Sequence, residues 1–535
     1  MKFVSISAAW FFLLCATAFA QTPATVGQNV LVVPFENQSK APGIEWISDS
    51  FPELLQARLN SATLFVLPRA DRIRAYDRVG IPVELHPSRA TLYRIAEQLD
   101  VDYVVLGLYH FDGRTFTATA QLLDMKRPHL LPEMNESGPL TQLIDIQTAL
   151  AWDILHALHP NISVSKQAYL AAATPVRLDA FENYVRGVTA TTNQEQIEHF
   201  REAVRLNPIY AEALLQLGKA YYRERQYEQA ASTLTRVPEN DPLAREARFY
   251  LGLAAYYQGD FQRADAAFRF VAASLPLAEV YNNLGVVSSH GDKKTAGEYF
   301  QKAIDADPSD PDYHFNLAVE LYRAGDSAGA SRQLRDTLSL RPNDSAARSL
   351  LDVIAPDGST PAQRTIVSAS QKTPVERIRA NYDESSFRQL ALKIEAVAEQ
   401  RLAKTDPITH AQFHSDRGHQ FLNQGFLSEA KTEFQEALAL NPSNPQAHAG
   451  LASVLEAENN ETGARAEAAQ ALRFREFAEP LLVLARLDLR DNRPEAAAEN
   501  IDRALRLEPS NAAALALKRA IAAKLAQEAQ PLPNR

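Results

Sequence analysis

The sequence predicts an α+β multidomain protein, with an α/β sandwich at the amino end followed by a mostly α-helical solenoid. Three observations predict this fold class. Short apolar runs of strand type alternate with helical patterns over residues 28–160. A phrase of 33 to 34 residues then recurs over 177–354 and again over 411–528. The chain of 535 residues has a 46% hydrophobic content, which is typical of a folded protein with several domains.

In the amino-terminal part, strand and helix patterns follow one another and close on a hairpin. Asp112-Gly113 separates two strand-like runs and is a strong turn signal for an antiparallel pair. The expected strands are 29–36, 64–68, 102–111 and 114–125, and the expected helices are 45–60, 69–80, 88–99 and about 139–158. Strands that alternate with helices in this way predict an α/β sandwich over 28–160.

The recurring phrase has a small residue, an alanine and a proline at fixed places. It begins at Leu217-Gly218 and returns at Leu251-Gly252 and Leu284-Gly285. In each copy an alanine follows, then a larger apolar residue four positions later, then a proline. We expect the small residues to let two antiparallel helices approach closely and the larger residue to fill the gap between neighbouring pairs. Proline ends each unit because it cannot continue a helix.

The short breaks inside the units carry residue types that tolerate a positive φ. These are Gly259, Gly325, Gly425, Asn459 and Asn492.

This pattern resembles the tetratricopeptide repeat over about 177–350 and 411–511, with 511–528 as a closing helix. The resemblance implies helix-turn-helix units that stack and leave a concave groove lined by the first helix of each unit. By the family's groove places, the residues implied to bind a partner are Lys219, Tyr222, Phe249, Tyr256, Asn282, Phe315 and Tyr322. The alternative is that these aromatic side chains only pack between units. The set departs from the Lys/Asn-rich clamp that holds a terminal carboxylate in some family members.

Two segments separate the arrays. Residues 355–374 are rich in Pro, Gly, Ser and Thr and show no helical period, which predicts a linker. Residues 375–404 carry a helical stripe through Phe387, Leu390 and Ile394, which predicts helices that bridge the arrays.

The phrases VVPFEN, ELLQARL, VLPR and DYVVLGLY, in this order, resemble the amino-terminal domain of TolB and its relatives over about 28–160. The resemblance implies an interaction module of the bacterial envelope. Tetratricopeptide-like units stand where a TolB β-propeller would follow, so the propeller's partners are not implied.

The first residues, MKFVSISAAWFFLLCATAFA, predict a secretory signal peptide over 1–20. Cys15, the only cysteine, lies inside it, and Leu14 before it is not the small residue that a lipoprotein signal requires. The mature chain would therefore contain no disulfide and would depend on packing. No later stretch is apolar for long enough to span a bilayer. We expect an exported, soluble protein, with the periplasm favoured by the TolB resemblance.

No catalytic or cofactor-binding motif is recognisable. The chain lacks a phosphate-binding loop, a zinc-protease motif and a nucleophile elbow. With 55 Lys+Arg against 65 Asp+Glu and no basic run, nucleic-acid binding is disfavoured. Asp307, Asp310 and Asp312 crowd one loop, and a solvated turn with a helix-capping Asp is favoured there over calcium binding.

Histidines are close together in the second array, at His410, His414 and His419. A metal site is one interpretation of this cluster. However, His314, His414 and His448 share the fourth place of their units, which favours packing at the seam between the two helices of a unit. We therefore predict no metal site.

The sequence as a whole predicts a non-enzymatic, exported scaffold whose concave groove binds a peptide or helix of a partner protein. Two alternatives stay open at this point. One is a structural component of an outer-membrane or secretion assembly, and the other is a glycan-active enzyme with an unrecognised site. The partner, the pathway, the oligomeric state and the continuity of the two arrays are not encoded in any recognisable motif.

Overall fold

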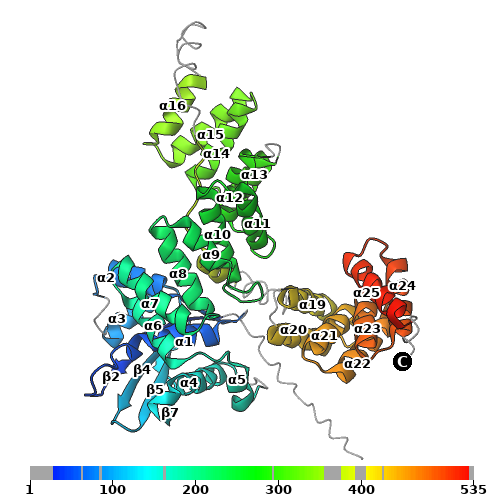
Figure 1. The fold of residues 1–535 in the computed structure, drawn as a ribbon, viewed down its shortest axis with the longest axis horizontal. Helices are drawn as coiled ribbons and strands as arrows, with labels where there is room; N and C mark the ends of the chain where they lie inside the picture. Colours follow the sequence, from blue (N-terminus) through cyan, green and yellow to red (C-terminus); the bar gives the residue numbers. More distant parts are fainter. Residues whose placement is uncertain are drawn as a thin grey trace, which may run out of the picture.

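The computed structural model describes residues 28–61, 64–82, 87–160, 164–291, 295–354, 375–391, 405–423 and 427–528. The expected signal peptide (1–20) and linker (355–374) lie outside these ranges. Figure 1 shows a sheet with helices at the amino end (blue to cyan), a stack of paired helices that continues from it (green), and a second stack at the carboxyl end (olive to red).

A mixed sheet forms the amino-terminal part. Its strands are ordered β3 (Leu64–Val66), β1 (Gln28–Val32), β4 (Tyr103–Phe111), β5 (Phe116–Asp124) and β6 (His129–Leu130), while β2 (Glu36–Asn37) pairs with β4 and β7 (Met134–Gly138) pairs with β5. β1 runs parallel to β3 and β4, and β5 runs antiparallel to β4. The predicted hairpin is present, with Gly113 at φ +94° in its turn. The sequence did not indicate β2, β6 and β7, because they are short or lack an apolar alternation.

Helices cover both faces of the sheet. α1 (Ile47–Leu59) and α4 (Leu143–Leu158) pack on one face, and α2 (Arg69–Val79) and α3 (Arg89–Gln98) pack on the other. The apolar run 30–33 alternates between the two faces, since Val30 and Val32 belong to the first cluster and Leu31 and Val33 to the second. A strand that is buried on both faces reads as a continuous apolar run, as NVLVV does.

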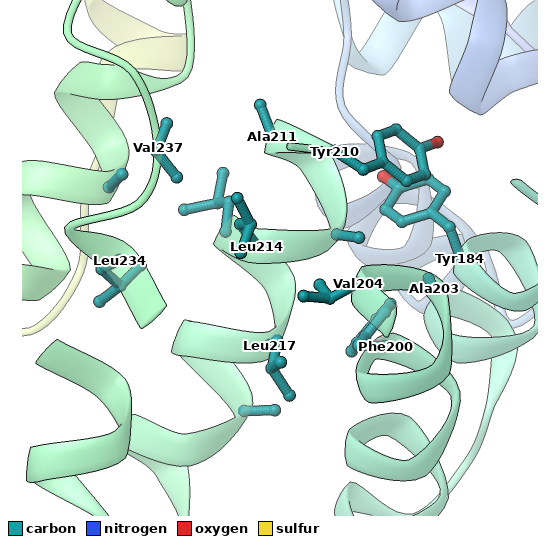
Figure 2. Close-up of a cluster of buried hydrophobic side chains, with 14 of the residues drawn as sticks. Tyr184, Phe200, Ala203, Val204, Tyr210, Ala211, Leu214, Leu217, Leu234 and Val237 are labelled. Atoms are coloured by element: carbon teal, nitrogen blue, oxygen red, sulfur yellow. The ribbon is translucent and has the colours of Figure 1, made fainter. Parts of the chain in front are cut away.

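The α/β part and the first array share one apolar cluster. Leu54 of α1 is buried together with Phe181 and Tyr184 of α6 (Leu178–Thr189). The Trp46 ring meets the Phe181 ring edge-on with centroids 6.1 Å apart. The Tyr184 hydroxyl donates to Glu53 Oε2 at 3.0 Å. Figure 2 shows how this cluster continues from Tyr184 into the following helices, so the first repeat unit is anchored on α1.

Paired helices build both arrays. After the short α5 (Lys166–Ala172), the first array holds α6, α7 (Asn193–Leu206), α8 (Ala211–Arg223), α9 (Tyr227–Leu234), α10 (Ala244–Tyr257), α11 (Phe261–Ala272), α12 (Ala278–Ser289), α13 (Ala296–Ala306), α14 (Pro311–Arg323), α15 (Ser327–Leu340) and α16 (Ser345–Ile354). The second holds α19 (Pro407–Asn423), α20 (Leu427–Leu440), α21 (Pro445–Ala457), α22 (Glu461–Phe474), α23 (Ala478–Arg490), α24 (Pro494–Leu507) and α25 (Ala512–Glu528). None of the helices in the described ranges combines the length and apolar character needed to cross a membrane.

The small residue of each first helix faces the large residue of its own second helix. A Cβ added at Gly285 would lie 2.5 Å from Cε1 of Phe300, and one added at Gly218 would lie 2.4 Å from Cγ of Leu234. The large residue therefore fills the space at the crossing point of the two helices of one unit. It also packs on the next unit, as expected from the sequence, since Phe300 shares a cluster with Tyr313 and Leu317 of α14, and a Cβ added at Gly450 of α21 would lie 2.1 Å from Cζ of Phe434.

The breaks inside the units adopt the left-handed conformation that the sequence predicted at four positions. Gly259 and Gly325 have φ of +77° and +87°, and Asn459 and Asn492 have φ of +60° and +58°. Gly425 lies outside the described residues. Arg225 takes the same conformation at φ +58°, which its residue type did not indicate.

Histidine at the fourth place of a unit bonds to the second helix of the same unit. His448 Nδ1 lies 2.6 Å from Glu467 Oε2, and its Nε2 lies 3.0 Å from the carbonyl oxygen of Pro442. His314 makes the same two contacts, with Gln333 and with the carbonyl of Pro308. His414 Nδ1 likewise meets Glu433 Oε2 at 2.8 Å. This arrangement is the seam role expected from the sequence. In the described part of the chain no three His, Cys, Asp or Glu side chains are grouped to hold a metal.

The segment after the expected linker differs from the bridging helices predicted over 375–404. Residues 375–383 are not helical, and only 384–391 form a helix. Residues 392–404 lie outside the described residues. The non-helical course has a physical cause, because the backbone groups of Arg377 and Arg379 are hydrogen-bonded to asparagine side chains of the first array.

We predict that Gly285→Ala destabilises the protein, because the new methyl group overlaps the Phe300 ring at the helix crossing. Overpacking of this kind costs about 1–3 kcal/mol. Gly297→Ala is the matched control, since a Cβ at this helical position meets nothing within 4 Å, and Ala is favoured over Gly in helices by about 1 kcal/mol. Thermal unfolding of the two variants measures this. Equal unfolding temperatures for both would contradict the packing described above.

A second prediction concerns pH. Burial lowers the pKa of His448 and of His419, but the hydrogen bonds that their ring nitrogens donate to Glu467 and Glu479 outweigh it and raise each pKa above its ordinary value. The folded state therefore holds these protons more tightly, so the stabilisation is complete below about pH 6.5 and is lost as the pH rises through the folded pKa values. We expect the unfolding temperature of the wild type to exceed that of Glu467→Gln/Glu479→Gln most at pH 6, with a smaller difference at pH 8.5. A difference that grows with pH would overturn this assignment.

Candidate functional site

The first helices of the first array hold a segment of the same chain. Residues 376–384 contact α10, α12, α14 and the start of α16, which are the first helices of successive units. The segment runs back along the array, from α16 and α14 at its start to α10 at its end. The groove that the sequence assigned to a partner is thus occupied by residues 376–384, which we call the docked segment.

Asparagine side chains bind the backbone of the docked segment. Asn282 and Asn316 both donate to the carbonyl oxygen of Arg377, at 2.9 and 2.8 Å, and Asn316 Oδ1 accepts from the Arg377 amide at 2.7 Å. Asn283 makes the same pair of bonds with Arg379, both at 2.8 Å. Alternate residues are therefore paired on one side, as in a β-ladder, and this pairing requires an extended backbone. All three asparagines are fully buried in this state.

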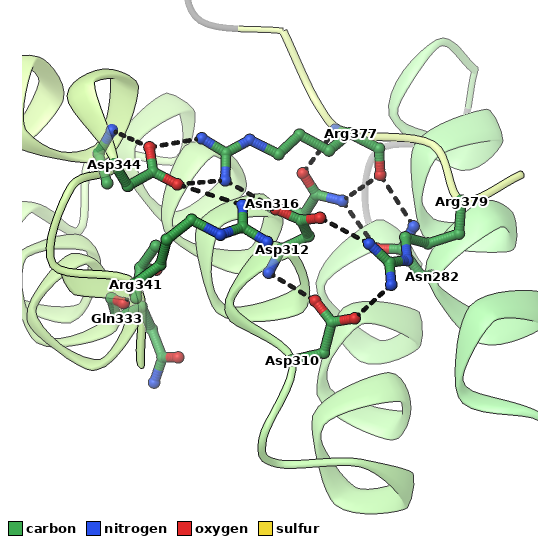
Figure 3. A network of polar contacts seen from close by, with 11 residues as sticks. Asn282, Asp310, Asp312, Asn316, Gln333, Arg341, Asp344, Arg377 and Arg379 are labelled. Carbon is green, nitrogen blue, oxygen red and sulfur yellow. Dashed lines mark hydrogen bonds and ion pairs between the residues drawn. The ribbon is translucent and has the colours of Figure 1, made fainter. Parts of the chain in front are cut away.

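Carboxylates bind the two arginine side chains (Figure 3). Arg377 forms a bidentate pair with Asp344, with Nη1 and Nη2 at 2.7 and 2.8 Å from the two oxygens, and it reaches Asp312 at 2.8 Å. Its guanidinium also stacks on the Phe315 ring at 3.6 Å from the centroid. Arg379 bridges Asp310 and Asp312 at 2.6 and 2.7 Å. These contacts bind the arginine side chains, whereas the asparagines bind only the backbone.

The ion pairs lower the pKa values of the carboxylates that form them. Hydrogen bonds from Arg377 lower the pKa of Asp344 to about 2. Burial raises the pKa of Asp312, but the hydrogen bonds of Arg341 and Arg377 lower it overall. Both carboxylates are thus ionised at any physiological pH, and they stabilise positive charge at this end of the groove.

The flanks of the docked segment fit the groove as well. Glu376 pairs with Arg323, and burial of Glu376 is outweighed by this pair, so its pKa falls below the ordinary value. The Tyr382 ring lies 5.2 Å from the Phe249 ring. Arg245 donates to Glu384 at 2.8 Å.

Beyond the groove, the chain reaches the α/β part. Ser385 Oγ donates to Asp71 Oδ2 at 2.6 Å. Arg388 donates to the carbonyl oxygen of Ser61, and its guanidinium lies 4.9 Å from the Phe65 ring centroid. Residues 376–388 therefore connect the far units of the first array with the sheet domain.

The residues that the sequence assigned to the groove differ in whether they contact the docked segment. Phe249, Asn282 and Phe315 contact the docked segment directly. Tyr256 packs against the same apolar cluster as Ile378. Tyr322 packs against a different cluster, next to α16.

The two remaining residues of the predicted set pack between units. Tyr222 lies in a group of tyrosine rings with Tyr227, Tyr250 and Tyr257. Lys219 pairs with Glu246 at 2.6 Å. Tyr222 also packs against the apolar cluster that Tyr382 of the docked segment contacts, so it takes part in both kinds of packing.

The aspartates at 307, 310 and 312 were expected in a solvated turn. Asp310 does cap α14, through the Asp312 amide at 2.9 Å. Asp312, however, is 7% exposed and bonds three arginines, so the solvated interpretation is wrong for it. Asn283, Asn316 and Asp344 were not recognised from the sequence as groove residues. A signal for Asn316 existed, because it stands 34 residues after Asn282 and so occupies the same place in the next unit.

Comparison with known proteins supports the repeat assignment. The family model described as "Tetratricopeptide repeat" matches residues 197–245, 215–264, 249–311 and 415–479. BBSome complex member BBS4 of Xenopus tropicalis is 30% identical over 125 residues, which are 22% of this chain and 24% of that protein. The chain thus spans about a quarter of that relative's length.

Two solved structures are similar to parts of the chain. MamA 41-end from Desulfovibrio magneticus RS-1 is 22% identical over 32% of this chain and 100% of that chain, with a TM-score of 0.30. YrrB, titled as a TPR protein with an unusual peptide-binding site, is 16% identical over 32% of this chain and 89% of that one, with a TM-score of 0.29. The chain carries tetratricopeptide repeats, in two arrays that follow an amino-terminal α/β domain.

Proposed function

We propose that the protein is a non-enzymatic scaffold outside the cytoplasm, and that the groove of its first array binds an extended segment of a partner protein. The observation that carries this proposal is the backbone pairing by Asn282, Asn283 and Asn316. Side-chain amides that bond to both the N–H and the C=O of alternate residues bind any extended chain, whatever its sequence. Tetratricopeptide repeats generally act as protein-interaction modules, which supports the same conclusion.

The proposed location rests on the sequence alone. The signal-type stretch at 1–20 and the TolB-like phrases over 28–160 support export to the periplasm of a bacterial envelope. In this proposal the α/β domain holds the first array in place, because α1 and α6 share one apolar cluster. The rigid base leaves the groove as the surface that exchanges partners.

The test uses an open form of the chain, in which residues 375–391 are replaced by a Gly/Ser stretch of equal length. We expect this form to capture a specific protein by crosslinking in its own cell envelope, because the Gly/Ser stretch keeps none of the ion pairs of Arg377 and Arg379 and so competes only weakly for the groove amides. Adding Asn282→Ala/Asn316→Ala should reduce the captured amount at least about tenfold, since several hydrogen bonds of about 0.5–1.5 kcal/mol each are lost. Quantitative mass spectrometry of the crosslinked products measures this.

Asn135→Ala in the same open form is the matched control. Asn135 is an exposed asparagine of β7 that bonds Thr119, far from the groove. It should leave capture unchanged. Equal capture of the same protein by the folded Asn282→Ala/Asn316→Ala form would show that the groove is not the binding surface.

A further inference from the structure

We propose that the groove of the first array selects an extended protein segment with arginine at two alternate positions, and that the docked segment is a built-in competitor for it. This inference rests on the proposed function and specifies the ligand and its control. The docked segment supplies the pattern, because Arg377 and Arg379 are the residues whose side chains the groove reads. Ile378 between them faces the apolar cluster of α12, α13 and α14.

The groove is built for guanidinium groups and not for positive charge alone. Asp344 takes Arg377 in a bidentate fork, and Asp312 accepts a third bond from the same side chain. The flat group also stacks on Phe315 at 3.6 Å. A lysine ammonium has neither the fork nor the flat face, so it cannot make these contacts together. Two residues further on, Arg379 bridges Asp310 and Asp312, and this contact again suits a guanidinium.

Charge complementarity indicates what replaces the docked segment when it leaves. Once the segment has left, Arg341 is the one arginine of the array, within the described ranges, that pairs with these carboxylates, which are Asp310, Asp312 and Asp344. Three carboxylates against one guanidinium leave an excess of two negative charges at the end of the groove. An incoming segment with two arginines restores the balance, whereas an acidic or apolar segment leaves these groups unpaired.

The competitor is joined to the array through residues 355–374, so it is always present at high local concentration. Covalent linkage makes its docking intramolecular, so its occupancy does not fall when the protein is diluted. A partner therefore binds only the fraction of molecules in which the groove is open, and its apparent affinity falls by that fraction. Opening the groove should raise the affinity for a free segment of the same pattern.

The experiment uses a fluorescent peptide with the sequence of residues 375–387, VERIRANYDESSF, and measures its anisotropy with the mature chain. Three chains are compared, namely the wild type, Arg377→Glu/Arg379→Glu, and the open form with the Gly/Ser stretch. We expect both altered chains to bind the peptide at least about tenfold more tightly than the wild type does. A peptide with Lys at both arginine positions should bind the altered chains at least about tenfold more weakly. Arg473→Glu/Arg506→Glu, which changes two exposed arginines of the second array, should bind like the wild type.

Each result has a defined meaning. If the lysine peptide binds as well as the arginine peptide, the arginine selection is wrong while the proposed function stands. If neither peptide binds either folded altered chain, the proposed function fails for this groove as well. If the wild type binds as tightly as the altered chains, the docked segment is no competitor. If the wild type forms dimers that Arg377→Glu/Arg379→Glu abolishes, the ligand is a second copy of the chain and the inference of a separate partner is overturned.

Discussion

The buried amide groups of three asparagines determine the course of the segment that follows the first array. Asn282, Asn283 and Asn316 have no exposed surface, and a buried amide must be hydrogen-bonded because leaving it unpaired costs about 1–3 kcal/mol. An extended backbone satisfies them, since it offers an N–H and a C=O at every second residue. A helix cannot, because its own backbone bonds use the same groups. The segment at 375–383 is therefore extended, and the helix begins only at residue 384.

The sequence predicted those parts of the fold in which one residue decides the local geometry. Gly285 indicates a close helix crossing, and Gly259 a left-handed turn, because few other residues fit there. The sequence did not predict the parts in which the interacting residue lies far away in the chain. Asn282 could be assigned to the groove from its place in the repeat, but the residue that it binds there, Arg377, lies 95 residues further on. The residue type also failed to predict the turn at Arg225. Arginine disfavours a positive φ, yet Arg225 adopts one because the turn inside the unit requires it.

The docked segment also joins two parts of the molecule, the α/β domain and the first array, that already share a core. The first repeat unit is fixed on α1 by packed side chains around Leu54 and Phe181. Further along, Ser385 and Arg388 add polar contacts from the same segment to Asp71 and to the Ser61 carbonyl. The packed contacts hold independently of the groove, whereas the polar ones depend on the segment being in place. Departure of the segment would therefore uncover part of the α/β domain without detaching the array from it.

Two kinds of burial explain why exchange is confined to the groove. Phe300 is buried against Gly285 of its paired helix and against Tyr313 and Leu317 of the next unit, so its burial belongs to the repeat fold itself. Asn316 and Asp312 are buried by a segment that belongs to no repeat unit, and water can solvate them when it leaves. The ion pairs and amide bonds are each exchanged for hydration, so the net free energy of docking is a small difference between large terms. A small difference of this kind can be reversed by a competing segment with the same two arginines, which is what the geometry of the groove favours.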